Sequence, residues 1–303
     1  MSTLHIVGVH GIRQGSAATT AGLSSRWQMS VAAALAAAGD AGRVGPIELT
    51  VPSYQGAFPK TATRHIRLGP EAVDAADTPV DEEEEDFILE ALAAYEPSAA
   101  DDAETDDASL VPGRTLGEGW LTPRILRRAH AVDRKAGKGV TARLMWLVRE
   151  AHTYLRDEET GAAVRAKVGE ALAETGAGMV IAHSLGSVVF YDMLSRGEIP
   201  GARGGELGVT TLVTCGSPLS WLAVRAGVHT AGNPLAVPAG VEWTNLYASN
   251  DYVAKGGGLA HLASGVVDVK VNNGALQPHD VHRYLDKAAV SERILKAAAG
   301  RGK

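Results

Sequence analysis

Short apolar runs alternate along this chain with segments of helical periodicity, and that alternation restricts the fold more than any other sequence feature. Continuous apolar runs, rather than strict apolar–polar alternation, are typical of strands that are buried on both faces. Strands of this kind, separated by helices, favour a mostly parallel central sheet with helices on both faces. We therefore predict an α/β fold. The predicted strands are 4–9, 47–52, 179–182, 209–215, 241–247 and 265–271.

Helical segments fall between the predicted strands. Three of them stop at a glycine, the residue most often found just after a helix C-terminus. A further helical period starts at Thr141, from which apolar residues recur on one face. The predicted helices are 21–38, 161–175, 185–196 and 284–299, together with the segment that begins at Thr141.

One long stretch, residues 54–138, interrupts the alternation. Within it, 16 of the 35 acidic residues fall in 71–107, and no Lys or Arg accompanies them. A dense group of basic residues follows from Arg124, and we expect the two groups to attract each other. Because no aromatic residues are interleaved with the bases, the pattern does not favour nucleic-acid binding. We predict a single domain over 1–303, with 54–138 inserted as an acidic and basic cap or lid that is partly disordered around 71–110.

The sequence MVIAHSLGSVVF carries the first sign of chemistry. Its apolar strand ends just before Ser184, and a helical pattern starts at Leu185. A strand, a sharp turn and a helix, with small residues two positions to either side of the serine, are typical of a nucleophile elbow, and Ala182 and Gly186 meet that requirement. The helix N-terminus would also favour negative charge near the serine. A serine that only caps the helix is the alternative; as a nucleophile, Ser184 should present an accessible hydroxyl at the carboxyl edge of the sheet.

Four parts of the chain together carry a family resemblance. They are the serine turn, IVGVHGI at the first strand, TLVTCGSPL after the serine helix, and the pair NLYASNDYV and HDVHRYL. On these residues the chain resembles the α/β-hydrolase superfamily, in particular its small bacterial lipase- and esterase-like members. The resemblance covers 4–52 and 141–299 and implies the α/β-hydrolase fold. The acidic insertion has no counterpart in the common core of that superfamily.

Chain order indicates partners for Ser184. Asp251 and His279 each lie beyond the end of a predicted strand, where open parallel sheets form their sites. The order serine, acid, histidine is the one that this elbow uses. An imidazole accepts the serine proton near neutral pH, and a buried carboxylate holds the imidazole in the required tautomer. We predict Ser184 as nucleophile, His279 as base and Asp251 as the acid that orients it.

Both partners have rivals. His282 lies three residues after His279, and both precede the last predicted helix. Asp268 is the rival acid, although it lies inside a predicted strand rather than beyond its end. The resemblance favours His279, because in that group the catalytic histidine stands five residues before a Tyr-Leu pair, here Tyr284-Leu285. The two histidines could also bind a metal, but no third ligand of that kind is nearby, so we predict no metal site.

An acyl-transfer site also needs donors for the oxyanion. One is the amide of the residue after the nucleophile, here Leu185. The resemblance implies Ile12, in the loop after the first strand, as the second donor. We expect His10 and Gly11, in the same loop, to contact the substrate. The glycine spacing of this loop, G-x-x-G-x-x-x-G, does not match a dinucleotide-binding turn.

These features predict a serine hydrolase that cleaves a carboxylic ester through an acyl-enzyme, without a metal or an organic cofactor. The expected partner is a small-molecule ester or a lipid-like substrate, not a nucleic acid. The same residues would serve a thioesterase, an acyltransferase or an amidase, because only the leaving group and the acceptor differ. A non-catalytic binding module of the same fold is the remaining alternative.

The last sequence features concern location. The chain enters an apolar strand without the basic region of a signal peptide. Its longest alanine-rich apolar run, 31–38, is far shorter than the roughly 20 residues that span a bilayer. The single cysteine, Cys215, excludes an intrachain disulfide and suits a reducing compartment. We therefore expect a cytoplasmic protein without an integral membrane segment.

Overall fold

The strands form one parallel sheet. The computed structural model describes residues 3–11, 18–59, 81–93, 122–136, 140–199, 208–228, 235–254 and 257–300. Within them, six strands pair in the order β2-β1-β3-β4-β5-β6, and every pair is parallel. The predicted parallel α/β sheet is confirmed, and each strand lies within two residues of its expected limits. The strands are β1 (Leu4–Val9), β2 (Ile47–Thr50), β3 (Met179–His183), β4 (Thr211–Cys215), β5 (Glu242–Ala248) and β6 (Val266–Val271).

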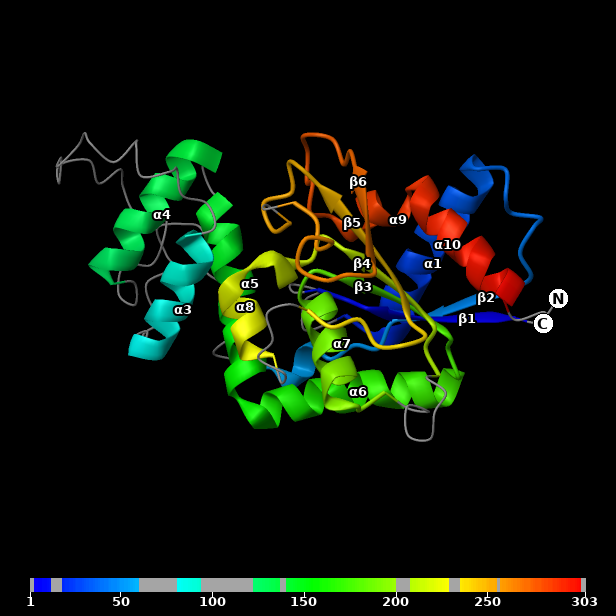
Figure 1. Ribbon diagram of the computed structural model, residues 1–303, viewed down its shortest axis with the longest axis horizontal. Helices are drawn as coiled ribbons and strands as arrows, with labels where there is room; N and C mark the ends of the chain where they lie inside the picture. The colour runs from blue at the N-terminus through cyan, green and yellow to red at the C-terminus, as the bar shows by residue number, and fades with distance from the viewer. Residues whose placement is uncertain are drawn as a thin grey trace.

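Helices cover both faces of the sheet (Figure 1). On one face, Ile6 and Met179 belong to a buried apolar cluster with Trp27 and other residues of α1 (Thr20–Ala37), α9 (Val281–Leu285) and α10 (Ala288–Gly300). On the other face, the alternate strand residues, Val7 and Val180 among them, pack with a second set of helices. That set contains α5 (Val140–Arg156), α6 (Glu158–Thr175), α7 (Leu185–Arg196) and α8 (Leu222–Gly227). Burial on two faces explains why the strands read as continuous apolar runs.

The prediction of one final helix over 284–299 is wrong. The structure has two helices here, because Asp286 leaves helical geometry with φ −79° and ψ 2° and so ends α9. The Asp280 side chain accepts a hydrogen bond from the His282 amide and fixes the start of α9, in the manner of an N-cap. The short helix α9 thereby directs Tyr284 toward the carboxyl edge of the sheet.

The described part of the insertion includes helical segments. Residues 82–93, inside the stretch expected to be partly disordered, form α3 (Glu82–Ala93). Four acidic residues occupy the first turn of α3, where they complement the helix dipole, and an apolar face that includes Ile88 and Leu92 is buried. A second described α-helix of the insertion is α4 (Pro123–Ala136), which packs with α3 against α5, away from α1 and α10 (Figure 1). Residues 60–80 and 94–121 lie outside the described residues.

Ion pairs join the acidic helix to its basic neighbours. Glu84 contacts Arg149 of α5 at 2.7 Å, and Glu85 contacts Arg124 of α4 at 3.7 Å. These pairs agree with the expected attraction between the acidic and basic parts of the insertion. The buried face of α3 belongs to the same apolar cluster as α5 to α8. The described part of the insertion is therefore continuous with the core on that face of the sheet.

Among the helices that the structure describes, none is both long and apolar enough to cross a bilayer.

Candidate active site

Ser184 occupies a strained turn between β3 and α7. Its φ of 54° lies in the left-handed region, which only one other described non-glycine residue, Gln277, also adopts. The turn brings α7 against β1, so a Cβ added at Gly186 would lie 2.1 Å from the carbonyl oxygen of Val9. Position 186 therefore admits only glycine, which is the steric demand of a nucleophile elbow.

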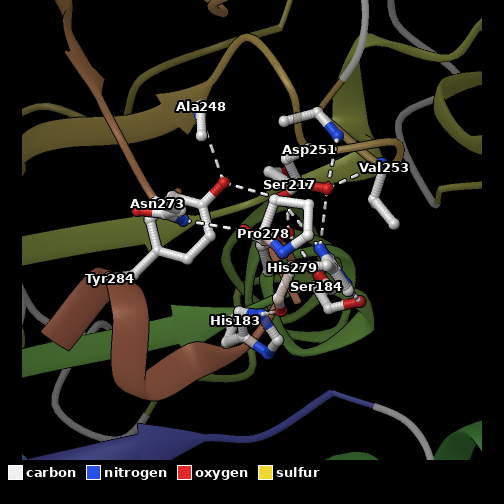
Figure 2. A network of polar contacts seen from close by, with 12 residues as sticks. His183, Ser184, Ser217, Ala248, Asp251, Val253, Asn273, Pro278, His279 and Tyr284 are labelled. Atoms are coloured by element: carbon white, nitrogen blue, oxygen red, sulfur yellow. Dashed lines mark hydrogen bonds and ion pairs between the residues drawn. The ribbon is translucent and has the colours of Figure 1, made fainter. Parts of the chain in front are cut away.

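The structure brings Ser184, His279 and Asp251 together (Figure 2). Nε2 of His279 lies 2.9 Å from Oγ of Ser184. Nδ1 of His279 lies 2.9 Å from both carboxylate oxygens of Asp251. Because a carboxylate only accepts, Nδ1 carries the proton of the neutral imidazole, and Nε2 is left to accept from the serine hydroxyl. In this order of partners the imidazole can accept the hydroxyl proton while the carboxylate orients the ring.

The rival residues lie elsewhere. Nδ1 of His282 pairs with Oγ of Ser30 on α1 at 2.7 Å and not with Ser184. The carboxylate of Asp268 accepts hydrogen bonds from the Leu259 and Ala260 amides, each at 2.8 Å, and so fixes a surface turn. The two histidines therefore do not converge, and no group of three or more His, Cys, Asp or Glu residues in the described ranges is placed to hold a metal ion.

Asp251 is buried and heavily hydrogen-bonded. It is only 1% exposed, and besides His279 its carboxylate accepts from the Val253 amide at 2.7 Å and the Tyr284 hydroxyl at 2.5 Å. Burial alone would raise the pKa of Asp251. The nearby His279 and the hydrogen bonds from His279, Tyr284 and Val253 outweigh burial and hold that pKa below its ordinary value. Asp251 is thus kept ionised, as an acid that orients an imidazole must be.

Two side chains hold the backbone of the loop that carries His279. Nε2 of His183 lies 2.9 Å from the His279 carbonyl oxygen, and Nδ2 of Asn273 donates to the Pro278 carbonyl at 2.7 Å (Figure 2). Burial, reinforced by the neighbouring His279, lowers the pKa of His183 to about 3. His183 therefore stays neutral, and its Nε2–H donates to the carbonyl. The loop that presents His279 is tied to β3 on one side and to its own start on the other.

Of the predicted oxyanion donors, one is described. Leu185 is the first residue of α7, so its N–H has no acceptor within the helix and is available to a ligand. Ile12, the donor that the resemblance implies, lies outside the described residues. Gly11, just before it, borders Ser184: a Cβ added there would lie 2.7 Å from Cβ of Ser184 and 3.2 Å from its Oγ. The loop after β1 thus lies directly on the serine.

His10 does not have the exposure that a substrate contact requires. Its side chain is fully buried, its ring stacks on Tyr54 at 3.9 Å, and Nδ1 donates to the Gly11 carbonyl at 2.6 Å. The Tyr54 hydroxyl in turn donates to the His10 carbonyl oxygen. His10 therefore braces the loop after β1 rather than lining a binding surface.

Ser184 is fully covered in this structure, with an exposed fraction of 0%, whereas the His279 side chain retains 12%. The accessible hydroxyl that the sequence led us to expect is therefore not found. The backbone of Gly11 is one of the groups that border the serine, since a Cβ added there would lie 2.7 Å from Cβ of Ser184. A substrate carbonyl reaches Oγ only if the groups that cover the serine move.

Three supporting residues were given no role by the sequence analysis, although Gly216 and Ser217 lie within the segment TLVTCGSPL that carries part of the resemblance. At Gly216, a Cβ would lie 2.8 Å from Oδ2 of Asp251, so a glycine here makes room for the acid and the imidazole. Oγ of Ser187 lies 2.6 Å from the Ser184 carbonyl oxygen and 2.7 Å from Oγ of Ser217, and these hydroxyls tie α7 to the loop after β4. Contacts between such distant segments follow from the tertiary fold and not from any local pattern.

The site lies at the point where the strand order reverses. β2 adds to one side of β1 and β3 to the other, and Gly11 follows β1 while Ser184 follows β3. Crevices beyond the carboxyl ends of two such strands are where open α/β sheets bind ligands. The fold and the site thus define an α/β protein with a serine, a histidine and an aspartate joined at the switch point of a parallel sheet. No family model matches the chain, and neither the curated proteins nor the solved structures contain a significant match.

The brace at His10 predicts acid sensitivity. Burial lowers the pKa of His10 to about 4, while the bond to Gly11 opposes that shift. His10 therefore becomes protonated near pH 6.5 in the unfolded chain but only near pH 4 in the folded chain. The free energy of unfolding consequently falls as pH drops from about 6.5 to about 4. We expect His10 to contribute at most about 1.4 kcal/mol per pH unit, with most of the change below pH 6.5, measured by urea unfolding between pH 7 and 5. His10→Gln should remove this part of the pH dependence and leave the part that His183 contributes, whereas the exposed His261→Gln should remove neither; equal slopes in all three proteins would contradict the prediction.

Proposed function

We propose that the chain is a serine hydrolase of the α/β-hydrolase fold that cleaves carboxylic esters through an acyl-enzyme. The observation that carries the proposal is the continuous contact from Ser184 Oγ to His279 Nε2 and from His279 Nδ1 to Asp251, each step at 2.9 Å. Hydroxyl, imidazole and ionised carboxylate in this order form the arrangement that activates a serine.

The reaction proceeds in two halves. Ser184 Oγ attacks the ester carbonyl carbon while its proton passes to Nε2 of His279; the leaving alkoxide then takes that proton and departs as the alcohol. Water next gives a proton to Nε2 and attacks the acyl carbon. The acid product leaves as the proton returns to Ser184 Oγ. Asp251 stabilises the imidazolium in both halves and does not itself become protonated.

Negative charge on the carbonyl oxygen needs donors. The Leu185 amide supplies one, and the α7 N-terminus adds its dipole. We assign the second to the amide of Ile12, from the family resemblance. Each donor of this kind contributes about 3 kcal/mol to the transition state.

Substrate entry requires movement at the serine, because Ser184 is fully covered. The insertion over 54–138 is proposed as the cap or lid of the site, with α3 and α4 as its ordered base on α5. A small ester or a lipid-like molecule is the proposed substrate. The cytoplasm is the proposed location, since the one cysteine, Cys215, is buried and free.

A thioester, an amide or an acyl acceptor other than water would use the same three residues. The leaving group is the part of the reaction that differs. Turnover of matched p-nitrophenyl esters and thioesters over a range of acyl chain lengths separates these activities, and we expect the oxygen esters to react.

The proposal is tested with a fluorophosphonate, which reacts with an activated serine. We expect one covalent adduct at Ser184, found by mass spectrometry, and faster labelling by a small methyl reagent than by a long-chain one because the serine is covered. Ser184→Ala should abolish labelling. Ser195→Ala, which changes a hydroxyl further along α7 that donates to the Asp192 carbonyl, should not. A folded wild-type chain that neither labels nor hydrolyses any ester of the panel would contradict the proposal.

A further inference from the structure

Tyr284 reaches the site from α9, from which its hydroxyl points at the carboxylate of Asp251 (Figure 2). We infer that Tyr284 is a positioning residue of the reaction, which holds Asp251 in the plane and charge state that His279 requires. The inference rests on the proposed function and extends it to a fourth side chain. Tyr284 does not touch the serine, so it acts through Asp251 alone.

Two runs of hydrogen bonds converge on the Asp251 carboxylate. The Ala248 amide donates to the Tyr284 hydroxyl at 3.2 Å, and that hydroxyl donates to Oδ2 of Asp251 at 2.5 Å. Nδ1 of His279 then donates to Asp251, and Ser184 donates to Nε2 of His279, both at 2.9 Å. Hydrogen bonds that are linked in a buried environment strengthen one another.

The donor state of Tyr284 is secure. Burial raises the pKa of its hydroxyl above the ordinary value, and the negative charge of Asp251 raises it further. The phenol therefore stays protonated wherever Asp251 is ionised. The Asp251 carboxylate is only 1% exposed, so bulk water does not reach it to replace a lost donor. Without the Tyr284 hydroxyl, Oδ2 of Asp251 would accept a hydrogen bond from the His279 ring only.

Packing does not account for the hydroxyl. The Tyr284 ring is fully buried in the apolar cluster between the sheet and helices α1, α9 and α10. A phenylalanine would fill the same space. Only the oxygen distinguishes the two side chains, and that oxygen contacts the acid. The carboxylate is bounded by Val253 on Oδ1 and by Tyr284 on Oδ2, so these two donors define its plane.

The test compares Tyr284→Phe with Tyr191→Phe. Tyr191 is also a buried tyrosine with one hydrogen bond to backbone, from the Ala236 amide, but it lies on α7 and does not contact the acid. We expect Tyr284→Phe to lower kcat for a p-nitrophenyl ester about tenfold while KM stays within twofold, since Tyr284 does not contact the substrate. Tyr191→Phe should change neither constant by more than twofold, although it should lower the melting temperature by a similar amount.

A double-mutant cycle with Asp251→Asn separates positioning from a general structural role. Because Tyr284 acts through the Asp251 carboxylate, Tyr284→Phe should change kcat less than twofold once Asp251 is asparagine. The same tenfold loss in both backgrounds would overturn the inference, and so would an active wild type with an unchanged Tyr284→Phe variant. A wild type that neither hydrolyses esters nor reacts with the fluorophosphonate would overturn the proposed function first, and this inference with it.

A second substitution covers the case in which Tyr284→Phe does not fold. A tyrosine fluorinated beside its hydroxyl, incorporated at position 284 only, keeps the ring and the hydrogen bond and makes the hydroxyl a stronger donor. We expect kcat to change at least twofold at an unchanged melting temperature. An unchanged kcat would overturn the inference.

Discussion

Replacing His279 by alanine is expected to lower ester turnover by about four orders of magnitude, whereas the same change at His282 should leave turnover within twofold. Nε2 of His279 is the group placed 2.9 Å from the Ser184 hydroxyl, so its loss leaves no base to accept the proton. The His282 ring instead joins α9 to Ser30 of α1. Loss of that bond should cost about 1 kcal/mol of stability and no chemistry.

The measurement is kcat/KM for a p-nitrophenyl ester with each purified variant, with circular dichroism to show that both remain folded. The two histidines are three residues apart, and only His279 contacts Ser184. The same substitution at His282 is therefore a matched control. Comparable losses in the two variants, or a larger loss at His282, would show that the base has been assigned to the wrong ring.

A second large effect is expected on stability. Gly186→Ala should lower the free energy of unfolding by about 3 kcal/mol or more, because the new Cβ would lie 2.1 Å from the Val9 carbonyl oxygen and 2.6 Å from that of His10. Backbone atoms of a central strand cannot rotate away as a side chain does. Either β1 moves or α7 does, and both carry parts of the site.

Gly169→Ala is the matched control for that change. Position 169 also lies inside a helix, α6, but a Cβ there would meet only Cε of Met193, at the ordinary contact distance of 3.9 Å. Alanine is the better helix former by up to about 1 kcal/mol, so this variant should be slightly more stable than wild type. Guanidinium unfolding of both variants gives the comparison, and a Gly186→Ala protein as stable as Gly169→Ala would refute the packing argument.

Much of the fold could be predicted because its signals are local. Strands that are buried on two faces read as apolar runs whatever their neighbours are, so all six were placed within two residues. The turn at Ser184 was predictable for a similar reason: its small residues, its strand and its helix are adjacent in the chain. The order of Ser184, Asp251 and His279 along the sequence also limited the choice of partners.

Other features depend on contacts between distant segments, and the sequence does not display them. The choice between His279 and His282 turns on which ring faces β3, which a spacing of three residues leaves open. The insertion was expected to be only partly ordered, because its acidic half has too little apolar content to fold alone. In the structure the apolar face of α3 packs against α5 and α8. Tyr284 entered the sequence argument only as a landmark near the histidine, and its contact with Asp251 emerges from the break between α9 and α10.

Three glycines lie so close to the site that they restrict which amino-acid substitutions the protein can accept. A methyl group added at any of three glycines would clash with a neighbour. The neighbour is Ser184 at Gly11, the Val9 carbonyl at Gly186 and the Asp251 carboxylate at Gly216. Random mutagenesis followed by selection for ester cleavage should leave these three codons unchanged, whereas codons 42 and 56, where a methyl group would meet nothing within 4 Å, should drift freely. At these three positions the site has room for the hydrogen atom of a glycine and for no larger side chain. Any amino-acid substitution there would therefore obstruct the site.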